Sequence, residues 1–330
     1  MKIGTIGTGN IVKEILKCVA MLEQSSCEAV YSRSFDTGKS LADSFHVETV
    51  YTSLNDLMQD NRIDTIYIAS PNSLHFEQAK MALEHGKHVL LEKPMTATVS
   101  QAQYLFHLAE QNDCFLLEAI TNQSLPNFHI ARRLLPEIGR VKIVQCSYSQ
   151  YSSRYDALLR GEIANVFNPT FEGGALADLN IYNIYFVLGL FGVPKHTAYY
   201  PNRHENGVDL SGIAILEYPD FICSCEAAKD TWGDNCAQIQ GEQGFITVKD
   251  GCNWISQVTL ETKTNRQIIN EQTEEKHWFY HLRDFERIIQ EQNREEYQRR
   301  KRHSLAVVDT LQKARLSAGI QYPVDLQPLV

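Results

Sequence analysis

The first twelve residues constrain the fold of this chain more than any other stretch. Residues 3–6 are β-prone, Gly7-Thr8-Gly9 follows, and apolar residues then recur at helical spacing from Ile11 onward. A strand, a glycine turn and a helix in this order are the setting of a dinucleotide-binding fingerprint. Gly7 would permit the tight turn, and Gly9 would let the backbone approach a pyrophosphate at the N-terminus of the helix.

The fingerprint departs from its usual form at one position. Val12 stands where a third glycine usually allows close packing of the helix on the strand. The alternative to a nucleotide site is a βα turn with a purely structural role in another α/β fold. On the first interpretation, the residues that contact the cofactor are Gly7, Thr8, Gly9, Asn10 and Ile11.

Strand and helix signals alternate as far as about residue 120. We expect further strands at 28–31, 49–51, 65–69, 88–91 and 115–117. We expect helices at 37–45, 54–58, 74–85 and 100–111. Such alternation predicts a Rossmann-type, doubly wound parallel sheet, and we assign residues 1–120 to this dinucleotide-binding domain.

The pattern changes after residue 120. A helix at 125–135, a long β stretch at 141–151, an irregular segment at 152–172 and an apolar helix at 177–190 are expected first. Strands joined by short turns follow at 197–200, 213–217, 221–227, 237–240, 245–248 and 258–262. This predicts an α+β domain over 121–330 with a large, mostly antiparallel open sheet. Helices at 278–292 and 304–317 close the chain and can pack back toward the first domain.

Composition excludes several classes of protein. The 330 residues carry a net charge of -9, which argues against nucleic acid as a partner. No apolar run reaches the roughly 18 residues of a membrane span, and the N-terminal strand leaves no room for a signal peptide. We therefore expect a cytoplasmic protein. The basic run 299–303 is expected on a solvated helix surface.

The eight cysteines are expected to be reduced thiols, since we expect the chain to stay in the cytoplasm. Cys223 and Cys225 would share one face of a strand. The sequence has no Cys-x-x-Cys and no histidine at ligand spacing, so it predicts no metal site. An open sheet needs cover for its outer face, and a second copy of the chain would provide it. We expect a homo-oligomer, a dimer or larger.

Polar residues follow three of the predicted strands, at the edge where ligands bind in open α/β sheets. The second strand is followed by Ser32 and Arg33, where an NAD site usually has an acidic residue. A hydroxyl and a guanidinium suit a 2′-phosphate, so NADP(H) is favoured over NAD(H). The remaining cofactor-binding candidates at this edge are Ser70, Pro71, Asn72, His75, Glu92 and Lys93.

Three residues are candidates for the chemistry. Lys93, beside a nicotinamide, could hydrogen-bond a substrate oxygen, although a lone lysine is usually an ordinary solvated residue. Asp178 and Tyr182 are four apart, so they share a face if the segment is helical. A phenol can donate a proton to a carbonyl, and the alternative is that Tyr182 is a core aromatic and Asp178 a helix cap.

Taken together, these motifs resemble the Gfo/Idh/MocA oxidoreductases along nearly the whole chain. The motifs are the nucleotide turn, Ser70-Pro71-Asn72 with His75, Gly86-Lys87-His88-Val89, Glu92-Lys93-Pro94, and Gly173-Gly174 before Asp178 and Tyr182. The resemblance implies a Rossmann domain, a bound NAD or NADP, a sheet that forms a dimer interface, and a catalytic role for Lys93. Tyrosine at 182 resembles the branch with dihydrodiol dehydrogenases, xylose dehydrogenases and glucose–fructose oxidoreductase, where it is the proposed general acid or base.

The resemblance predicts hydride transfer between a nicotinamide and a carbonyl or secondary alcohol of a small sugar, polyol or diol. Substrate contacts are expected from Gln123, Tyr151 and Tyr182. The chain departs from the family pattern at Asn180, where glycine is common, and at Thr121 and Gln123. An NAD-dependent glycosidase of the same family and a non-enzymatic NAD(P)-sensing protein are the alternatives.

Overall fold

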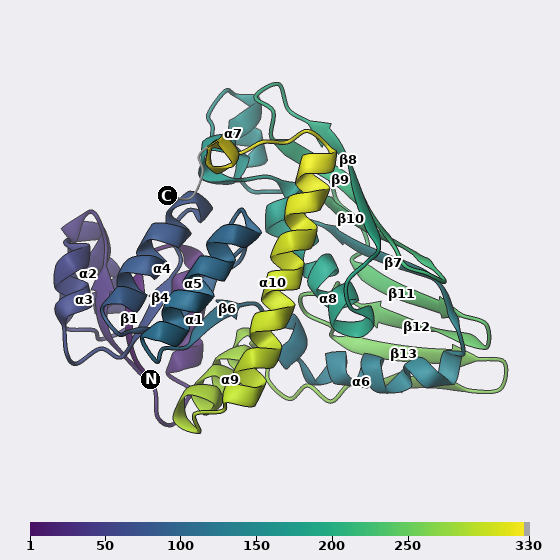
Figure 1. Cartoon of the computed structure of the whole chain (residues 1–330), viewed down its shortest axis with the longest axis horizontal. Helices are drawn as coiled ribbons and strands as arrows, with labels where there is room; N and C mark the ends of the chain where they lie inside the picture. Colours follow the sequence, from purple (N-terminus) through teal and green to yellow (C-terminus); the bar gives the residue numbers. More distant parts are fainter. Residues whose placement is uncertain (327–330) are drawn as a thin grey trace. The chain divides into compact units, whose positions relative to one another are not determined.

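The structure is a computed structural model that describes residues 1–326 (Figure 1). These residues form two compact units. Unit 1 comprises residues 1–120 together with 276–305, and unit 2 comprises 121–275 together with 306–326.

Unit 1 is built on a six-stranded parallel sheet in the order β3-β2-β1-β4-β5-β6. This order confirms the predicted doubly wound sheet. The central strand β4 is completely buried, which explains its continuous apolar sequence. The strands are β1 (Lys2–Ile6), β2 (Ser26–Tyr31), β3 (Thr49–Tyr51), β4 (Thr65–Ile68), β5 (His88–Glu92) and β6 (Leu116–Ala119).

Three helices of unit 1 begin with a side-chain cap. Ser34, Ser53 and Thr98 each accept a hydrogen bond from a backbone N–H in the first turn of α2, α3 and α5. These helices and their neighbours are α1 (Asn10–Val19), α2 (Phe35–Ser44), α3 (Leu54–Gln59), α4 (His75–Glu84), α5 (Val99–Gln111) and α9 (Trp278–Gln290).

Unit 2 is built on an eight-stranded sheet in the order β14-β13-β12-β11-β7-β10-β9-β8. All neighbours are antiparallel except β7 and β10, which run parallel at the centre. The mostly antiparallel sheet was predicted, and only β14 was missed. The strands are β7 (Val141–Ser149), β8 (His196–Arg203), β9 (Asp209–Glu217), β10 (Ile222–Ala228), β11 (Cys236–Gly241), β12 (Gly244–Lys249), β13 (Gln257–Thr262) and β14 (Arg266–Ile269).

Helices α6 (Pro126–Leu134) and α8 (Ile181–Phe191) contact one face of this sheet (Figure 1). Residues Pro169–Phe191 are long and apolar enough to cross a membrane by length and composition. However, 72% of the most apolar window is buried inside the structure, as is usual for a core helix. The segment predicted to be irregular contains α7 (Tyr155–Leu159) and short 3₁₀ turns.

The last helix, α10 (Arg294–Ser317), begins ten residues before the predicted start at Ser304. Its first turn carries Glu295 and Glu296, which favour a helix N-terminus. The basic run lies inside this helix, where Arg299 and Arg300 form ion pairs with Glu296. The polar first half of α10 therefore forms through local ion pairs, and its sequence lacks the apolar periodicity on which the prediction relied.

Candidate functional site

The turn between β1 and α1 has the geometry that a dinucleotide requires. Gly7 has a φ of 117°, and a Cβ at this position would lie 2.7 Å from the carbonyl oxygen of Ala69. Gly9 precedes α1 with no side-chain cap, and a Cβ added to it would meet nothing within 4 Å. The N-terminal amides of α1 are therefore approachable, as phosphate binding demands. Val12 is completely buried and takes up the space of the missing third glycine.

The predicted cofactor residues of unit 1 follow four adjacent strands. They come after β2, β1, β4 and β5, which are neighbours in that order in the sheet. Because the strands are parallel, these residues lie along one edge, and the order reverses between β1 and β4. This edge brings together Gly7–Ile11, Ser32, Arg33, Ser70–Asn72, Glu92 and Lys93.

The loop after β2 holds Ser32 inward and Arg33 outward. The Ser32 hydroxyl accepts a hydrogen bond from the backbone N–H of Ser34 at 3.3 Å. Arg33 is exposed, and no ion pair to it occurs within residues 1–326. Its guanidinium can therefore turn toward an anion at this edge.

His75 joins two of the loops at the sheet edge. Its Nε2 lies 3.0 Å from the carbonyl oxygen of Ser70, and its Nδ1 lies 2.9 Å from that of Pro94. The ring is completely buried, and burial lowers its pKa. These contacts make His75 a residue that holds the loops after β4 and β5 in place, and direct contact with the cofactor stays a prediction.

Lys93 lies in a loop that the half-buried Glu92 and the buried Glu118 support. The Tyr67 hydroxyl donates a hydrogen bond to Glu92 Oε1 at 2.7 Å, and the backbone N–H of Met95 donates to Glu118 Oε1 at 3.0 Å. Lys93 itself is half-buried at the end of β5. Its backbone is thus fixed by contacts on both sides of it.

In unit 2, the pair Gly173-Gly174 begins the segment that leads into α8. Gly174 has a φ of 128°, and a Cβ there would collide with the carboxylate of Asp209. That buried carboxylate accepts hydrogen bonds from the Leu176 backbone N–H and the Tyr199 hydroxyl, each at 2.7 Å. Asp209 therefore anchors the turn that leads into α8, and only glycine fits beside it.

Asp178 lies in a π-helical turn, Leu176–Asn180, which leads directly into α8. The prediction of a regular α-helix over this stretch is wrong, since a π turn contains one residue more than an α turn. Even so, the side chains of Asp178 and Tyr182 are both partly exposed. They are the only side chains between residues 172 and 188 that are not fully buried.

Lys229 is a site residue that the sequence analysis missed. It follows β10, its side chain is only 5% exposed, and its Nζ forms an ion pair with Asp178 Oδ2. A buried lysine needs such a partner, because an unpaired charge in the protein interior is costly. No sequence signal links these residues, which are 51 positions apart.

Aromatic and amide groups surround Tyr182. The ring of Tyr148 packs edge-on against it with centroids 5.9 Å apart, and Asn253 donates a hydrogen bond to the Tyr148 hydroxyl at 3.3 Å. The Thr121 hydroxyl donates to the backbone oxygen of Asn253 at 2.9 Å. Thr121, a departure from the family pattern, thus holds the turn that supports Tyr148.

Asn180, the other departure, is completely buried. Its side-chain amide donates to the backbone oxygen of Cys225 at 2.8 Å and accepts from Asn183 at 3.0 Å. Asn183 in turn donates to the backbone oxygen of Glu226. A glycine could not make these contacts, which tie the π turn to β10.

The two remaining substrate candidates lie in different surroundings. Gln123 is 7% exposed, and its amide faces Gly189, about 10 Å along α8 from Tyr182. The structure thus places Gln123 in the core, away from Tyr182. Tyr151 lies near the surface, stacks on the 77% exposed ring of Trp232, and donates a hydrogen bond to Asp156 at 2.6 Å.

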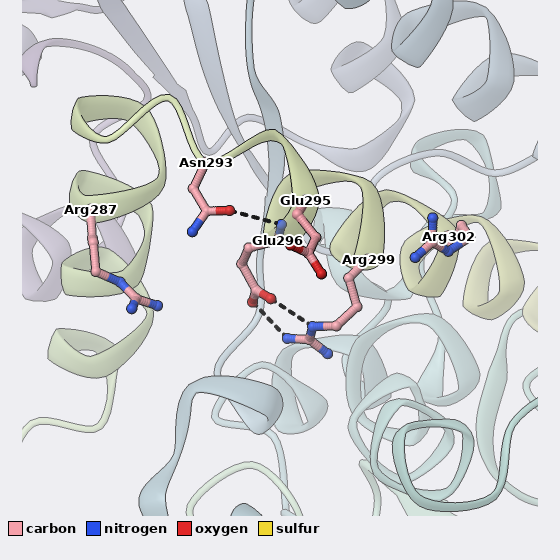
Figure 2. A pocket seen from close by; sticks show the side chains of 6 residues that line it. All are labelled: Arg287, Asn293, Glu295, Glu296, Arg299 and Arg302. Carbon is pink, nitrogen blue, oxygen red and sulfur yellow. Dashed lines mark hydrogen bonds and ion pairs between the residues drawn. The ribbon is translucent and has the colours of Figure 1, made fainter.

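A separate cavity of about 320 Å³ lies in unit 1 beside α9 and the start of α10 (Figure 2). Its wall is mostly charged, and Glu296 pairs there with Arg299. No residue from the strand ends lines it, so we do not assign it to the same site. The lining residues are Arg287, Asn293, Glu295, Glu296, Arg299 and Arg302.

The predicted residues therefore form two groups. Unit 1 gathers the nucleotide turn, the loop after β2 and Lys93 at one sheet edge. Unit 2 gathers Asp178 and Tyr182, with Lys229 and Tyr148 added by the structure. How Lys93 and Tyr182 act together is a matter for the proposal below.

Comparisons with known proteins agree with this architecture. The scyllo-inositol 2-dehydrogenase (NADP(+)) IolU of Bacillus subtilis is 33% identical over 326 residues, 98% of this chain and 99% of that protein. The uncharacterized oxidoreductase YgjR of Escherichia coli is 35% identical over 249 residues, 76% of each chain. The structure of levoglucosan dehydrogenase in complex with NADH is similar in fold, with a TM-score of 0.82, 17% identity and 97% of both chains covered.

Two family descriptions match separate parts of the chain. Residues 1–119 match an oxidoreductase family with an NAD-binding Rossmann fold, and residues 130–247 match the GFO/IDH/MocA C-terminal domain. These matches reach into both units and include every candidate residue except Gln123. The chain therefore belongs to the Gfo/Idh/MocA family of oxidoreductases.

Proposed function

We propose that this protein is an NADP(H)-preferring dehydrogenase or reductase that acts on a secondary alcohol or carbonyl of a small sugar, polyol or diol. The observation that carries the proposal is the dinucleotide turn of unit 1, and unit 2 by itself presents the partly exposed side chains of Asp178 and Tyr182. The names of relatives support the substrate class. IolU is named for an inositol, and mammalian relatives 25% identical over 260 residues are named for a dihydrodiol.

The residues at the edge of the parallel sheet fit a dinucleotide. Gly7 and Gly9 leave the N-terminus of α1 approachable, and its amides would bind the pyrophosphate. Ser32 and Arg33 would bind the 2′-phosphate of NADP, where an acidic residue would repel it. When bound, the nicotinamide accepts or supplies the hydride.

The protein's own task is to move one proton and to hold the reacting oxygen. Tyr182 would exchange its phenolic proton with that oxygen, and Lys93 would donate a hydrogen bond to it and ease ionisation of the phenol. Asp178 would hold this array in place, and Lys229 pairs with the Asp178 carboxylate and orients it.

We also propose that the outer face of the eight-stranded sheet joins two copies of the chain. Ile143 and Ile222 face each other on β7 and β10, and their side chains are 45% and 55% exposed. Ile213 on β9 is also exposed, at 42%. Replacing Ile143 and Ile222 with lysine should yield a monomer by light scattering, whereas an unchanged mass would contradict this interface.

The test of the function is an assay of aldoses, polyols and diols with NADP⁺ and NAD⁺, recorded as absorbance of the reduced nicotinamide. We expect net reduction of NADP⁺ with a polyhydroxylated substrate. Lys93→Met should abolish it and leave cofactor binding intact, whereas the exposed control Lys39→Met should leave it unchanged. Substrate turnover without net redox change would instead favour a glycosidase, and normal turnover by Lys93→Met would reject the proposed role of Lys93.

A further inference from the structure

Three buried cysteines meet on the inner face of the eight-stranded sheet. Cys146 on β7 lies directly opposite Cys225 on β10. Cys223 precedes Cys225 by two residues, so all three side chains point to the same face. Each side chain is at most 1% exposed. The sequence showed only that Cys223 and Cys225 share a face, and the third sulfur comes from a strand far away in the chain.

The sulfur atoms of these three cysteines lie close together. The sulfurs of Cys146, Cys223 and Cys225 all lie within 4.8 Å of one another, and the last two are 3.7 Å apart. Cys252, in the turn after β12, is also completely buried, and its thiol interacts with that of Cys146, although its sulfur lies outside the group of three. Four thiols from two strands and one turn therefore form a single cluster.

These distances suit a tetrahedral metal site. Zinc binds thiolate sulfur at about 2.3 Å, which places tetrahedral ligands about 3.8 Å from one another. The separations among the sulfurs of Cys146, Cys223 and Cys225 need to change by no more than about an ångström to reach that value, and the Cys252 sulfur has to approach them. We propose that Cys146, Cys223, Cys225 and Cys252 bind one Zn²⁺ ion, a structural site separate from the dehydrogenase chemistry.

If the packed thiols lose their protons, the charge balance favours thiolates that bind zinc over bare thiolates. Each thiol that binds the ion releases its proton to solvent, and the divalent cation offsets two of the four thiolate charges inside the core. No water is needed, because four protein sulfurs complete the tetrahedron. The competing interpretation is that four neutral thiols fill the core as small apolar side chains.

The ion would join elements that support the candidate substrate residues. Asn122 donates hydrogen bonds from its side-chain amide to the backbone oxygens of both Cys252 and Tyr182. The backbone oxygen of Cys225 accepts from Asn180 in the π turn. Zinc at this position would therefore hold β7, β10 and the turn after β12 as one support for α8.

The direct test is the zinc content of the full-length protein, purified after expression in zinc-supplemented medium. We expect about one zinc per chain for the wild type and less than about a tenth for Cys146→Ala and Cys223→Ala. Cys114→Ala removes a buried thiol of unit 1, outside the cluster, and should keep the full zinc content. A wild-type content near zero, or equal contents in all four proteins, would overturn the proposal.

A second measurement does not depend on folding of the variants. The wild-type protein is unfolded, and refolded with Co²⁺ in place of Zn²⁺. Tetrahedral thiolate ligation should give intense charge-transfer and visible absorption, which added Zn²⁺ removes. If the protein refolds with native circular dichroism and shows neither absorption, the cluster consists of packed thiols and the site does not exist.

Discussion

Lys229 Nζ and Asp178 Oδ2 form an ion pair in which the lysine is nearly inaccessible to solvent and the aspartate is one-third exposed. The two residues come from the end of β10 and from the π turn before α8. The buried cation therefore lies behind the carboxylate and leaves part of it facing outward. This arrangement orients Asp178 toward the same surface as Tyr182.

Replacing Lys229 with methionine should lower kcat at least about tenfold and lower the free energy of unfolding by about 1.5–3 kcal/mol, the usual value of a hydrogen bond to a charged group. Lys229→Arg keeps the charge and should recover part of both. Turnover and urea unfolding are measured in parallel. A variant that loses stability but keeps the kcat and pH profile of the wild type would show that the pair is purely structural.

Tyr182→Phe should lower kcat by roughly 10²–10⁴, the usual contribution of a positioned acid or base. The ring still packs against Tyr148, so the melting temperature and the affinity for the cofactor should stay near those of the wild type. The matched control is Tyr148→Phe, which removes a neighbouring hydroxyl and should cost far less. Equal effects of the two substitutions on a kcat–pH series would refute proton transfer by Tyr182.

Arg33→Ala should weaken NADPH binding by roughly ten- to more than a hundred-fold, because a charge-assisted contact is lost. NADH lacks the 2′-phosphate, so its affinity should hardly change. A fluorescence titration with both cofactors measures this, with Arg287→Ala as a control for loss of an exposed arginine elsewhere in unit 1. Parallel losses for both cofactors would mean that Arg33 does not read the 2′-phosphate.

Gly174→Ala should lower the free energy of unfolding by about 3 kcal/mol or more, because it combines a left-handed backbone with a collision against a buried carboxylate. Gly161 also has a positive φ, but a Cβ there meets nothing within 4 Å. Gly161→Ala should therefore cost only about 1 kcal/mol. Urea unfolding of both variants checks the contrast, and similar losses would show that Asp209 is readily displaced.

Stability should fall with pH below about 6.5, partly because of His281. Burial, together with the nearby His277 and Arg300, lowers the pKa of His281 to about 3. As pH falls, the His281 ring is therefore protonated in the unfolded state at a higher pH than in the folded state. The stability contributed by the neutral ring is lost between pH 6.5 and about 3.

His281→Leu should flatten this acid dependence by up to about 1.4 kcal/mol for each pH unit in that window. Urea unfolding between pH 7 and pH 5 measures it. His204→Leu, a histidine of unit 2 that is not fully buried, is the control. A slope identical to that of the wild type would show that other groups govern the acid response.

Much of unit 1 could be predicted because its information is local. The strand at Thr49–Tyr51 is found at its predicted bounds, and Ser53 caps α3. Each βα turn places its polar residues at the same edge, so strand order and the candidate edge follow from alternation alone. The glycine turn needed only the sequence around it.

The contacts of unit 2 could not be predicted in this way, because they join distant strands. The pairs Lys229–Asp178 and Asp209–Leu176 depend on the parallel neighbours β7 and β10 and on the return of β9, none of which has a local signature. β14 was missed because it is a short and largely exposed edge strand. The periodicity of apolar residues indicates which face of an element is buried, so it does not predict a strand that is largely exposed.

Because of the π turn at Leu176–Asn180, the orientation of Asp178 relative to Tyr182 depends on the number of residues in this segment. A helix that holds one extra residue rotates everything before that residue by about 100° relative to everything after it. Deletion of one residue in this segment would restore a regular helix and turn the Asp178 carboxylate away from Lys229, with every candidate side chain still present. In this helix, the number of residues determines how Asp178 is oriented relative to Tyr182. A scan of substitutions keeps that number constant, so it would never detect this dependence.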